Sequence, residues 1–309
     1  MYERQYDSAT TCYYDGVRKL IWMCVVVAAC DQGAKPAPPA KTSEAKVEPT
    51  RAFDDPLALL PVDSDFVFRI DTAALRRTPL WDKYAARVFG ALLPRLANCA
   101  GYDPLAEVAT VTGALNESPK QAILIFRGID RDKTMRCLQH APNDYVTVTG
   151  KNPEQSYVLA FVDGNTMVVQ GWQGVTTEVL RSTLQVGAPL RQRADVVAAQ
   201  KQLPAGASMT MIMPAGSKVL AKSAGVGVKM QQMTGSARVS ERLDMEIVMT
   251  LANNDGASQL AKMLQEQLKS AKSMFDKIEA RNDGDKVRLS IGMTEAQVTQ
   301  IASLLEPQF

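Results

Sequence analysis

Histidine is almost absent from this sequence: His140 is the only one among 309 residues. Catalytic units of the Ser–His or Cys–His kind need an imidazole base that a third group orients. Cys137, three residues earlier, is the only nucleophile close to it in sequence, and no Gly-x-Ser-x-Gly elbow, His-Glu-x-x-His zinc motif or phosphate-binding loop occurs. We therefore predict no catalytic residues, no cofactor and no enzymatic activity. The alternative is an enzyme whose site uses carboxylates and hydroxyls that no motif reveals.

A charge excess and long apolar runs are also lacking. The chain has 35 Lys and Arg residues and 33 Asp and Glu residues, a formal net charge of +2. Nucleic-acid-binding proteins neutralise phosphates with clustered Lys and Arg, so near-neutrality argues against a nucleic-acid partner. A helix that crosses a bilayer needs about 20 apolar residues, and no stretch reaches that length. We predict neither a nucleic-acid ligand nor a membrane-spanning helix.

The apolar run at residues 20–29 has flanks that indicate export. Arg18 and Lys19 precede it, Cys30 ends it, and a segment rich in Pro and Ala follows. A positive start, a short apolar core and small residues before a cleavage point are typical of a secretion signal. The ending Val27-Ala28-Ala29-Cys30 resembles the lipobox of bacterial lipoproteins, in which the cysteine is lipidated and becomes the first mature residue. The alternative is a buried strand or a short core helix, because valines 25–27 alone would suit a sheet.

This resemblance implies a chain organisation and a place in the cell. Residues 1–16 do not fit a signal and are interpreted as an N-terminal extension ahead of a true start at Val17; residues 17–29 are the signal peptide. Residues 30–54 hold few large apolar residues and are predicted to be a disordered tether. The lipidated Cys30 would hold the protein on a membrane of the bacterial cell envelope, periplasmic or surface-facing. Asp31 resembles an inner-membrane retention signal of enteric bacteria, but the choice of membrane stays open.

Cysteine use leaves two alternatives. Cys12 and Cys24 leave with the signal and Cys30 would be lipidated, so Cys99 and Cys137 remain of the five. In an oxidising compartment they could form a disulfide. We favour two independent buried thiols, because connectivity cannot be deduced from a sequence alone.

From residue 55 onward, strand and helix patterns alternate. Strand-like patterns occur at 64–71, 108–115, 121–127, 157–162, 166–170, 209–213, 235–240, 242–251 and 286–293. Helical patterns occur at 79–93, 131–139, 175–184, 195–203, 256–280 and 294–305. The order of elements in residues 55–190 resembles that in residues 191–309. We predict an α+β fold with an antiparallel or mixed sheet, helices packed on one face, and possibly two related halves.

A second resemblance covers about a tenth of the chain. Residues 59–81 contain Leu-Leu-Pro-x-Asp-x-Asp, then Phe-x-Phe-x-Ile-Asp, then Leu-Arg and Pro-Leu-Trp. This is similar to the opening of uncharacterised predicted lipoproteins of myxobacteria and related Gram-negative bacteria. The resemblance implies an exported, folded and anchored protein and carries no activity.

Methionine is concentrated in the second half, where ten of the 14 follow residue 200. Strand alternation places Met209, Met211 and Met213 on one face. Thioethers suit Cu(I), which makes these three weak candidates for a metal site. A methionine-rich core, or a pliable surface for an apolar ligand or partner helix, are the alternatives. We predict a lipid-anchored protein with a non-enzymatic binding or structural role toward an envelope protein or an apolar ligand.

Overall fold

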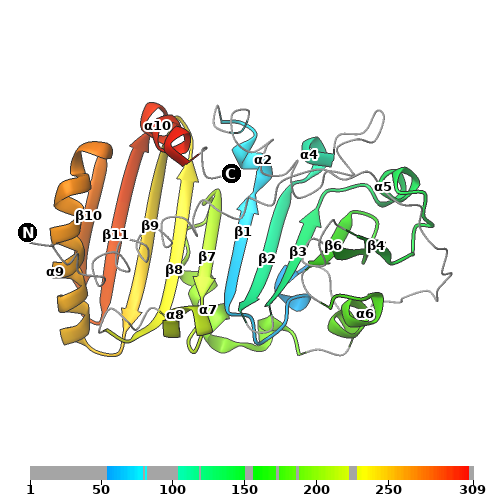
Figure 1. The fold of residues 1–309 in the computed structure, drawn as a ribbon, viewed down its shortest axis with the longest axis horizontal. Coiled ribbons are helices and arrows are strands. Elements are labelled where there is room, and N and C mark those ends of the chain that lie inside the picture. The colour runs from blue at the N-terminus through cyan, green and yellow to red at the C-terminus, as the bar shows by residue number, and fades with distance from the viewer. Residues whose placement is uncertain are drawn as a thin grey trace, which may run out of the picture.

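One antiparallel sheet of eleven strands forms the centre of the molecule, drawn face-on in Figure 1. The computed structural model describes residues 54–78, 81, 104–117, 120–149, 156–171, 174–185, 188–222 and 228–305. In spatial order the strands are β10 (Lys277–Asp283), β11 (Lys286–Thr294), β9 (Arg242–Leu251), β8 (Met230–Val239), β7 (Met209–Met213), β1 (Phe66–Asp71), β2 (Thr110–Glu117), β3 (Lys120–Arg127), β6 (Thr166–Gly171), β5 (Tyr157–Phe161) and β4 (Val146–Val148). The predicted α+β class is confirmed, and the sheet is antiparallel rather than mixed.

The strand order repeats across the middle of the sheet. From the centre outward it is β1-β2-β3-β6-β5 on one side and β7-β8-β9-β11-β10 on the other. β1 and β7 pair antiparallel at the centre, with Phe68 opposite Met211. The five strands nearest the centre on each side are therefore related by an approximate two-fold rotation about an axis normal to the sheet, and β4 adds a sixth strand to the β1 side.

Helices connect the strands in both halves. They are η1 (Pro56–Ala58), α2 (Thr72–Leu75), α4 (Pro104–Glu107), α5 (Arg131–Cys137), α6 (Thr177–Gln185), η4 (Leu190–Gln192), α7 (Ala194–Gln202), α8 (Lys218–Lys222), α9 (Asn254–Ala271), η6 (Lys272–Met274) and α10 (Glu295–Leu305). α5 and α9 follow the equivalent strands β3 and β9, and α6 and α10 follow β6 and β11. Among the described residues, no helix is long and apolar enough to cross a membrane.

Successive side chains of a strand point to opposite faces, so the sheet has two cores. The first face carries Phe66 and Phe68, and α5, α8 and α9 contribute Met135, Leu220 and Leu260 to the same cluster. On the second face, η1, α6, η4 and α7 cover the strands of the first half and β7. The cluster of this face contains buried residues of the first half together with Ile212 of β7, and among the described residues it includes none from β8 to β11. The helices thus divide between the two faces.

Gly113 and Gly235 occupy equivalent places beside the central strands. Gly113 lies opposite Phe68 on the neighbouring strand, and Gly235 lies opposite Met211. A Cβ atom on Gly113 would lie 2.5 Å from the Phe68 ring, and one on Gly235 would lie 2.6 Å from Met211 Cε. The missing side chains therefore let Phe68 and Met211 lie across the neighbouring strands.

One predicted helix ends earlier than expected. The apolar spacing favoured a helix over 256–280, but α9 ends at Ala271, a 3-10 turn follows, and Ile278 lies in β10. β10 forms a hairpin with β11 around Gly284, whose φ of +64° suits a tight turn. Sheet pairing therefore overrides the helical spacing of this segment. The helix predicted over 79–93 lies outside the described residues except for Trp81.

Local capping chemistry agrees with the sequence at the last helix. The Thr294 hydroxyl accepts a hydrogen bond from Gln297 N at 3.3 Å, and Gln297 Oε1 accepts one from Thr294 N at 2.9 Å. This reciprocal pair is a capping box, which satisfies backbone groups at the start of α10.

Candidate functional site

An apolar depression lies on the first face at the centre of the sheet. It encloses about 60 Å³ over β1, β7, β8 and β9. Its described lining residues are Phe66, Phe68, Arg69, Ile70, Met209, Thr210, Met211, Gly235, Ser236, Ala237, Met245 and Ile247. Small-molecule pockets usually measure about 300–1,000 Å³, so this depression accepts a few methyl or methylene groups rather than a whole enclosed ligand.

The three methionines predicted as weak metal-site candidates do not all lie at one site in the structure. Met209 and Met211 line the depression, where Met245 of β9 joins them. Met213 is 2% exposed, belongs to the first-face core and is absent from the described lining. β7 therefore presents two of its three thioethers to the depression. Among the described residues, His, Cys, Asp and Glu form no group of three that could hold a metal ion.

The pair of Cys137 and His140 offers no free thiol. Cys137 is disulfide-bonded, and its partner lies outside the described residues. This corrects the expectation of an independent thiol at Cys137. His140 Nδ1 lies 3.5 Å from Asp144 Oδ2 at the surface. A disulfide sulfur is not a thiolate nucleophile, so the Cys–His unit considered from the sequence does not exist in this oxidised form.

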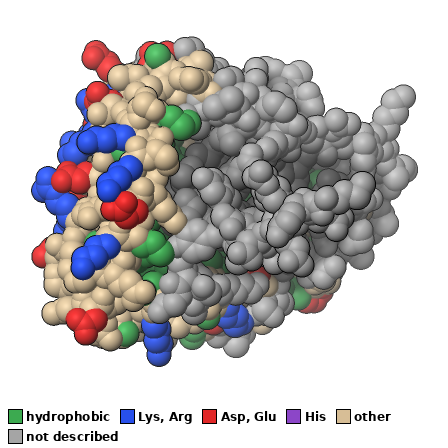
Figure 2. Space-filling view, turned by 60° about the vertical axis from the view of Figure 1, so that its left-hand side comes forward, with side chains coloured by type: hydrophobic (Ala, Val, Ile, Leu, Met, Phe, Trp, Pro, Cys, Tyr) green, Lys and Arg blue, Asp and Glu red, His purple; other side chains and the backbone are tan. Residues whose placement is uncertain are grey.

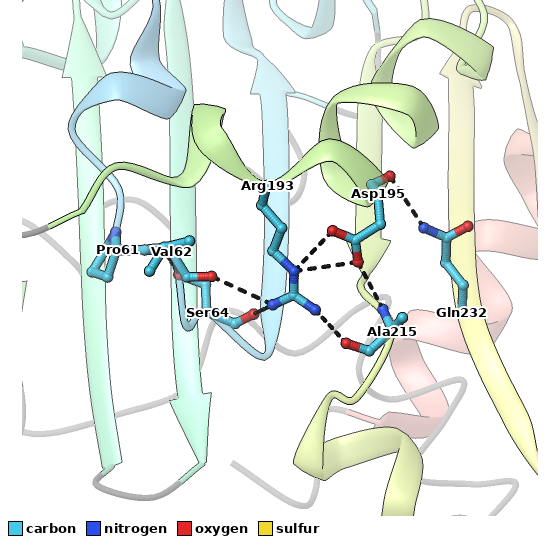
Figure 3. Close-up of polar contacts among 7 residues, drawn as sticks. All are labelled: Pro61, Val62, Ser64, Arg193, Asp195, Ala215 and Gln232. Carbon is cyan, nitrogen blue, oxygen red and sulfur yellow. Dashed lines mark hydrogen bonds and ion pairs between the residues drawn. The ribbon is translucent and has the colours of Figure 1, made fainter.

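A network of hydrogen bonds around Arg193 and Asp195 joins the two halves beside the central strands (Figure 3). Arg193 Nε donates to both carboxylate oxygens of Asp195, at 2.9 and 3.2 Å. Its other nitrogens donate to the backbone carbonyls of Val62 and Ser64, which precede β1, and of Ala215, which follows β7. Asp195 Oδ2 accepts a hydrogen bond from Ala215 N at 3.1 Å. These contacts fix the segments that enter and leave the central strands.

A buried carboxylate strengthens the same junction. Asp65 is 4% exposed, and its two oxygens accept hydrogen bonds from Lys218 N at 2.7 Å and from Glu117 N at 2.9 Å. At the equivalent place in the other half, the Ser208 hydroxyl accepts a bond from Val239 N at 3.1 Å. Because these groups bond to backbone within the fold, they support the architecture rather than form a binding site.

Shifted pKa values occur away from the depression. A hydrogen bond to Glu107, 3.0 Å from Lys133 Nζ, raises the pKa of Lys133. Burial raises the pKa of Tyr145, against the opposing effect of Arg181 above its ring. Among the described lining residues of the depression, Arg69 is the one ionisable group that carries charge at neutral pH. The depression is therefore suited to apolar contact and not to acid–base chemistry.

Sequence reasoning found the strands of this site but not their assembly. The alternation of Phe66, Phe68 and Ile70, and of the methionines of β7, was visible in the sequence. The antiparallel pairing of β1 with β7 has no local signal in the sequence, because the paired residues are more than 100 positions apart in the chain. Met245 was therefore missed as a lining residue. Cys30, the predicted lipidation site, lies outside the described residues.

No family model and no curated protein matches the chain. Among solved structures, crystal form I of TP0453 aligns with a TM-score of 0.47 and 10% sequence identity, covering 81% of this chain and 97% of that one. Crystal form III of TP0453 aligns with a TM-score of 0.45 and 11% identity, covering 81% of this chain and 98% of that one. At these TM-scores and identities the likeness is loose.

Proposed function

We propose that this chain is a lipid-anchored protein of the bacterial cell envelope that binds another envelope protein through the apolar depression. The anchor rests on the sequence: a basic start, an apolar core and the ending Val27-Ala28-Ala29-Cys30. The binding role rests on one observation, the apolar lining of a shallow site at the junction of the two halves. A volume of about 60 Å³ suits an inserted side chain of a partner better than a free small molecule.

The anchor is tested with cysteine variants of the full chain. In bacteria grown with an alkyne-labelled fatty acid, we expect the wild-type protein to carry the label and to sediment with membranes. Cys30→Ser should lose both properties, and Cys24→Ser should keep them because that residue precedes the cleavage point. Label retained by Cys30→Ser would refute lipidation at this residue.

The binding role is tested by photo-crosslinking in intact cells. A photoreactive amino acid replaces Met245, which is half-buried and lines the depression from the first face. We expect a discrete protein adduct that Met209→Gln removes, since a polar amide replaces a thioether of similar size. A photoreactive residue at Met274, which is 45% exposed and outside the described lining, is the matched control. An adduct with lipid alone would assign the depression to an apolar ligand, and yields equal to the control would refute a binding role.

A further inference from the structure

A second hollow lies on the second face of the sheet, over the half that α6 and α7 do not cover. We call it the polar hollow. Its floor is a row of three residues on β8, β9 and β11: Ser236 opposite Glu246, and Glu246 opposite Ser290. The loop with Pro204 and Ala207 bounds it on the side of β7. Its volume of about 340 Å³ falls within the range of small-molecule sites.

The adjacent row of opposed residues on the same face has a basic residue at each end. Arg238 lies opposite Asp244, Asp244 opposite Gly292, and Gly292 opposite Lys277. Adjacent strands lie about 4.8 Å apart, so the backbones of Arg238 and Lys277 are separated by about 14 Å. Both side chains line the hollow. Neither has an ion-pair partner among the described residues.

The acidic groups of the hollow are already neutralised. Asp244 Oδ1 accepts from Arg242 Nε at 3.0 Å, and Glu246 pairs with Arg288. Arg242 also reaches Asp276 at 2.9 Å. A Cβ atom on Gly292 would lie 2.5 Å from Arg242 Nη2, so the glycine leaves room for this guanidinium above the sheet. The nearby Asp244 raises the pKa of Arg242 and keeps it charged.

Two cations of the hollow take no part in its ion pairs. The four positive charges of Arg238, Arg242, Lys277 and Arg288 balance the four negative charges of Asp244, Glu246, Asp276 and Asp283. Among the described residues only Arg242 and Arg288 form these pairs, so Arg238 and Lys277 remain available to a ligand carboxylate. The hydroxyls of Ser236 and Ser290 make no hydrogen bond within the part of the chain that the structure describes. The floor therefore offers two free hydroxyls and a fixed carboxylate to a polar molecule. On the side of the molecule with α9 and β10, basic and acidic side chains are interspersed (Figure 2).

We propose that the polar hollow binds a small hydroxylated carboxylate, with an acidic monosaccharide as the chemical class that fits it. The ligand carboxylate pairs with Arg238 or Lys277 at the rim of the floor. The ring hydroxyls bond to Ser236, Ser290 and Glu246. This site is independent of the lipid anchor and of the apolar depression.

The test is a calorimetric titration of the purified full-length protein with three probes. We expect glucuronate, which has both the carboxylate and the hydroxyls, to bind at least tenfold more tightly than glucose or acetate, which have one each. The double variant Arg238→Gln/Lys277→Gln should weaken glucuronate binding at least tenfold. Arg281→Gln is the matched control, because Arg281 is an exposed arginine of β10 on the same face and outside the described lining. Met209→Gln should leave glucuronate binding unchanged.

Three results would overturn the proposal. Equal binding of glucose and glucuronate would remove the role of the charge. Unchanged glucuronate affinity in the double variant would place its binding elsewhere. Binding to phosphatidylglycerol vesicles that the double variant loses, without binding of glucuronate, would assign the hollow to a phosphodiester headgroup instead.

Discussion

The second face of the sheet is mainly apolar in the first half and polar in the second half. In the first half, one row of opposed residues reads Val67, Ala114, Ile123, Gln170 and Val158. The equivalent row in the second half reads Thr210, Ser236, Glu246, Ser290 and Glu279. The first row lies beneath α6 and α7, and the second forms the floor of the polar hollow and its flanks.

The difference shows that a repeated strand order does not repeat its packing. The first faces of both halves are apolar and share one cluster, and the pairing of β1 with β7 makes the sheet continuous. On the second face, apolar residues in one half support a second core, while polar residues in the other half leave a surface. The first half therefore has both faces covered, whereas the second half leaves its second face exposed.

The strongest test of this contrast exchanges equivalent residues. Val168 and Arg288 occupy the same position on the second face, and Val168 is fully buried. Val168→Arg places an unpaired charge in the second core, and we expect it to lower the free energy of unfolding by about 4 kcal/mol or more. Arg288→Val removes an exposed ion pair and should change it by less than about 1 kcal/mol. Urea unfolding followed by circular dichroism measures both, and equal losses would contradict the contrast.

A second test compares the two glycines of the first face. Gly113→Ala places a methyl group 2.5 Å from the Phe68 ring and 2.8 Å from Leu124, and should lower the free energy of unfolding by about 1–3 kcal/mol. Gly235→Ala meets Met211, whose flexible side chain can move, so we expect a loss below about 1 kcal/mol. The same unfolding measurement applies. A larger loss at Gly235 would show that Met211 is held as rigidly as Phe68.

Gln170 is the exception within the apolar row of the first half. It is fully buried, and neither side-chain polar atom has a hydrogen-bond partner among the described residues. Gln170→Leu should therefore raise the free energy of unfolding by about 1–2 kcal/mol, because a buried unsatisfied amide is replaced by an apolar group. Ser290→Ala, at the equivalent half-buried position, should change it by less than about 0.5 kcal/mol. A loss of stability in Gln170→Leu would mean that the amide is satisfied in solution.

Strand periodicity carried most of the information that the sequence held about this fold. The hairpin of β5 and β6 and the strand β9 have local signals, namely β-rich runs around a turn and a long alternating pattern. The ends of α9 were wrong, because Phe275 and Ile278 fit a helical stripe as well as a strand. β4 was missed, since its three residues are too few to show a period.

The apolar depression and the polar hollow depend on contacts that no local pattern encodes. Met209 and Met211 were candidates, but their role needed the neighbouring Met245 of β9. The polar hollow gathers residues of β8, β9, β10 and β11 that each look like ordinary surface positions of a strand. Only the register of these strands brings Arg238 and Lys277 to the two ends of one row.

The smallest effect that we expect is a pH dependence at the N-terminal cap of α5 that the equivalent cap of α9 does not share. Asp130 Oδ1 accepts from Lys133 N at 2.9 Å at the start of α5, and Asn253 Oδ1 accepts from Gly256 N at 2.8 Å at the start of α9. The backbone hydrogen bond from Lys133 lowers the pKa of Asp130 below its usual value of 3.8. The ionised carboxylate therefore stabilises the folded state above that value, and this stabilisation is lost as the pH falls through the lowered pKa.

Asn253 does not titrate, so only α5 should respond to acid. We expect the hydrogen-exchange protection of the Lys133 amide, corrected for intrinsic exchange, to fall between pH 5 and about pH 3, while that of the Gly256 amide stays constant. Asp130→Asn should make the two helices behave alike, since both caps would then be amides. A constant protection factor at Lys133 in the wild-type protein would show that the protonated carboxyl caps α5 as well as the carboxylate does.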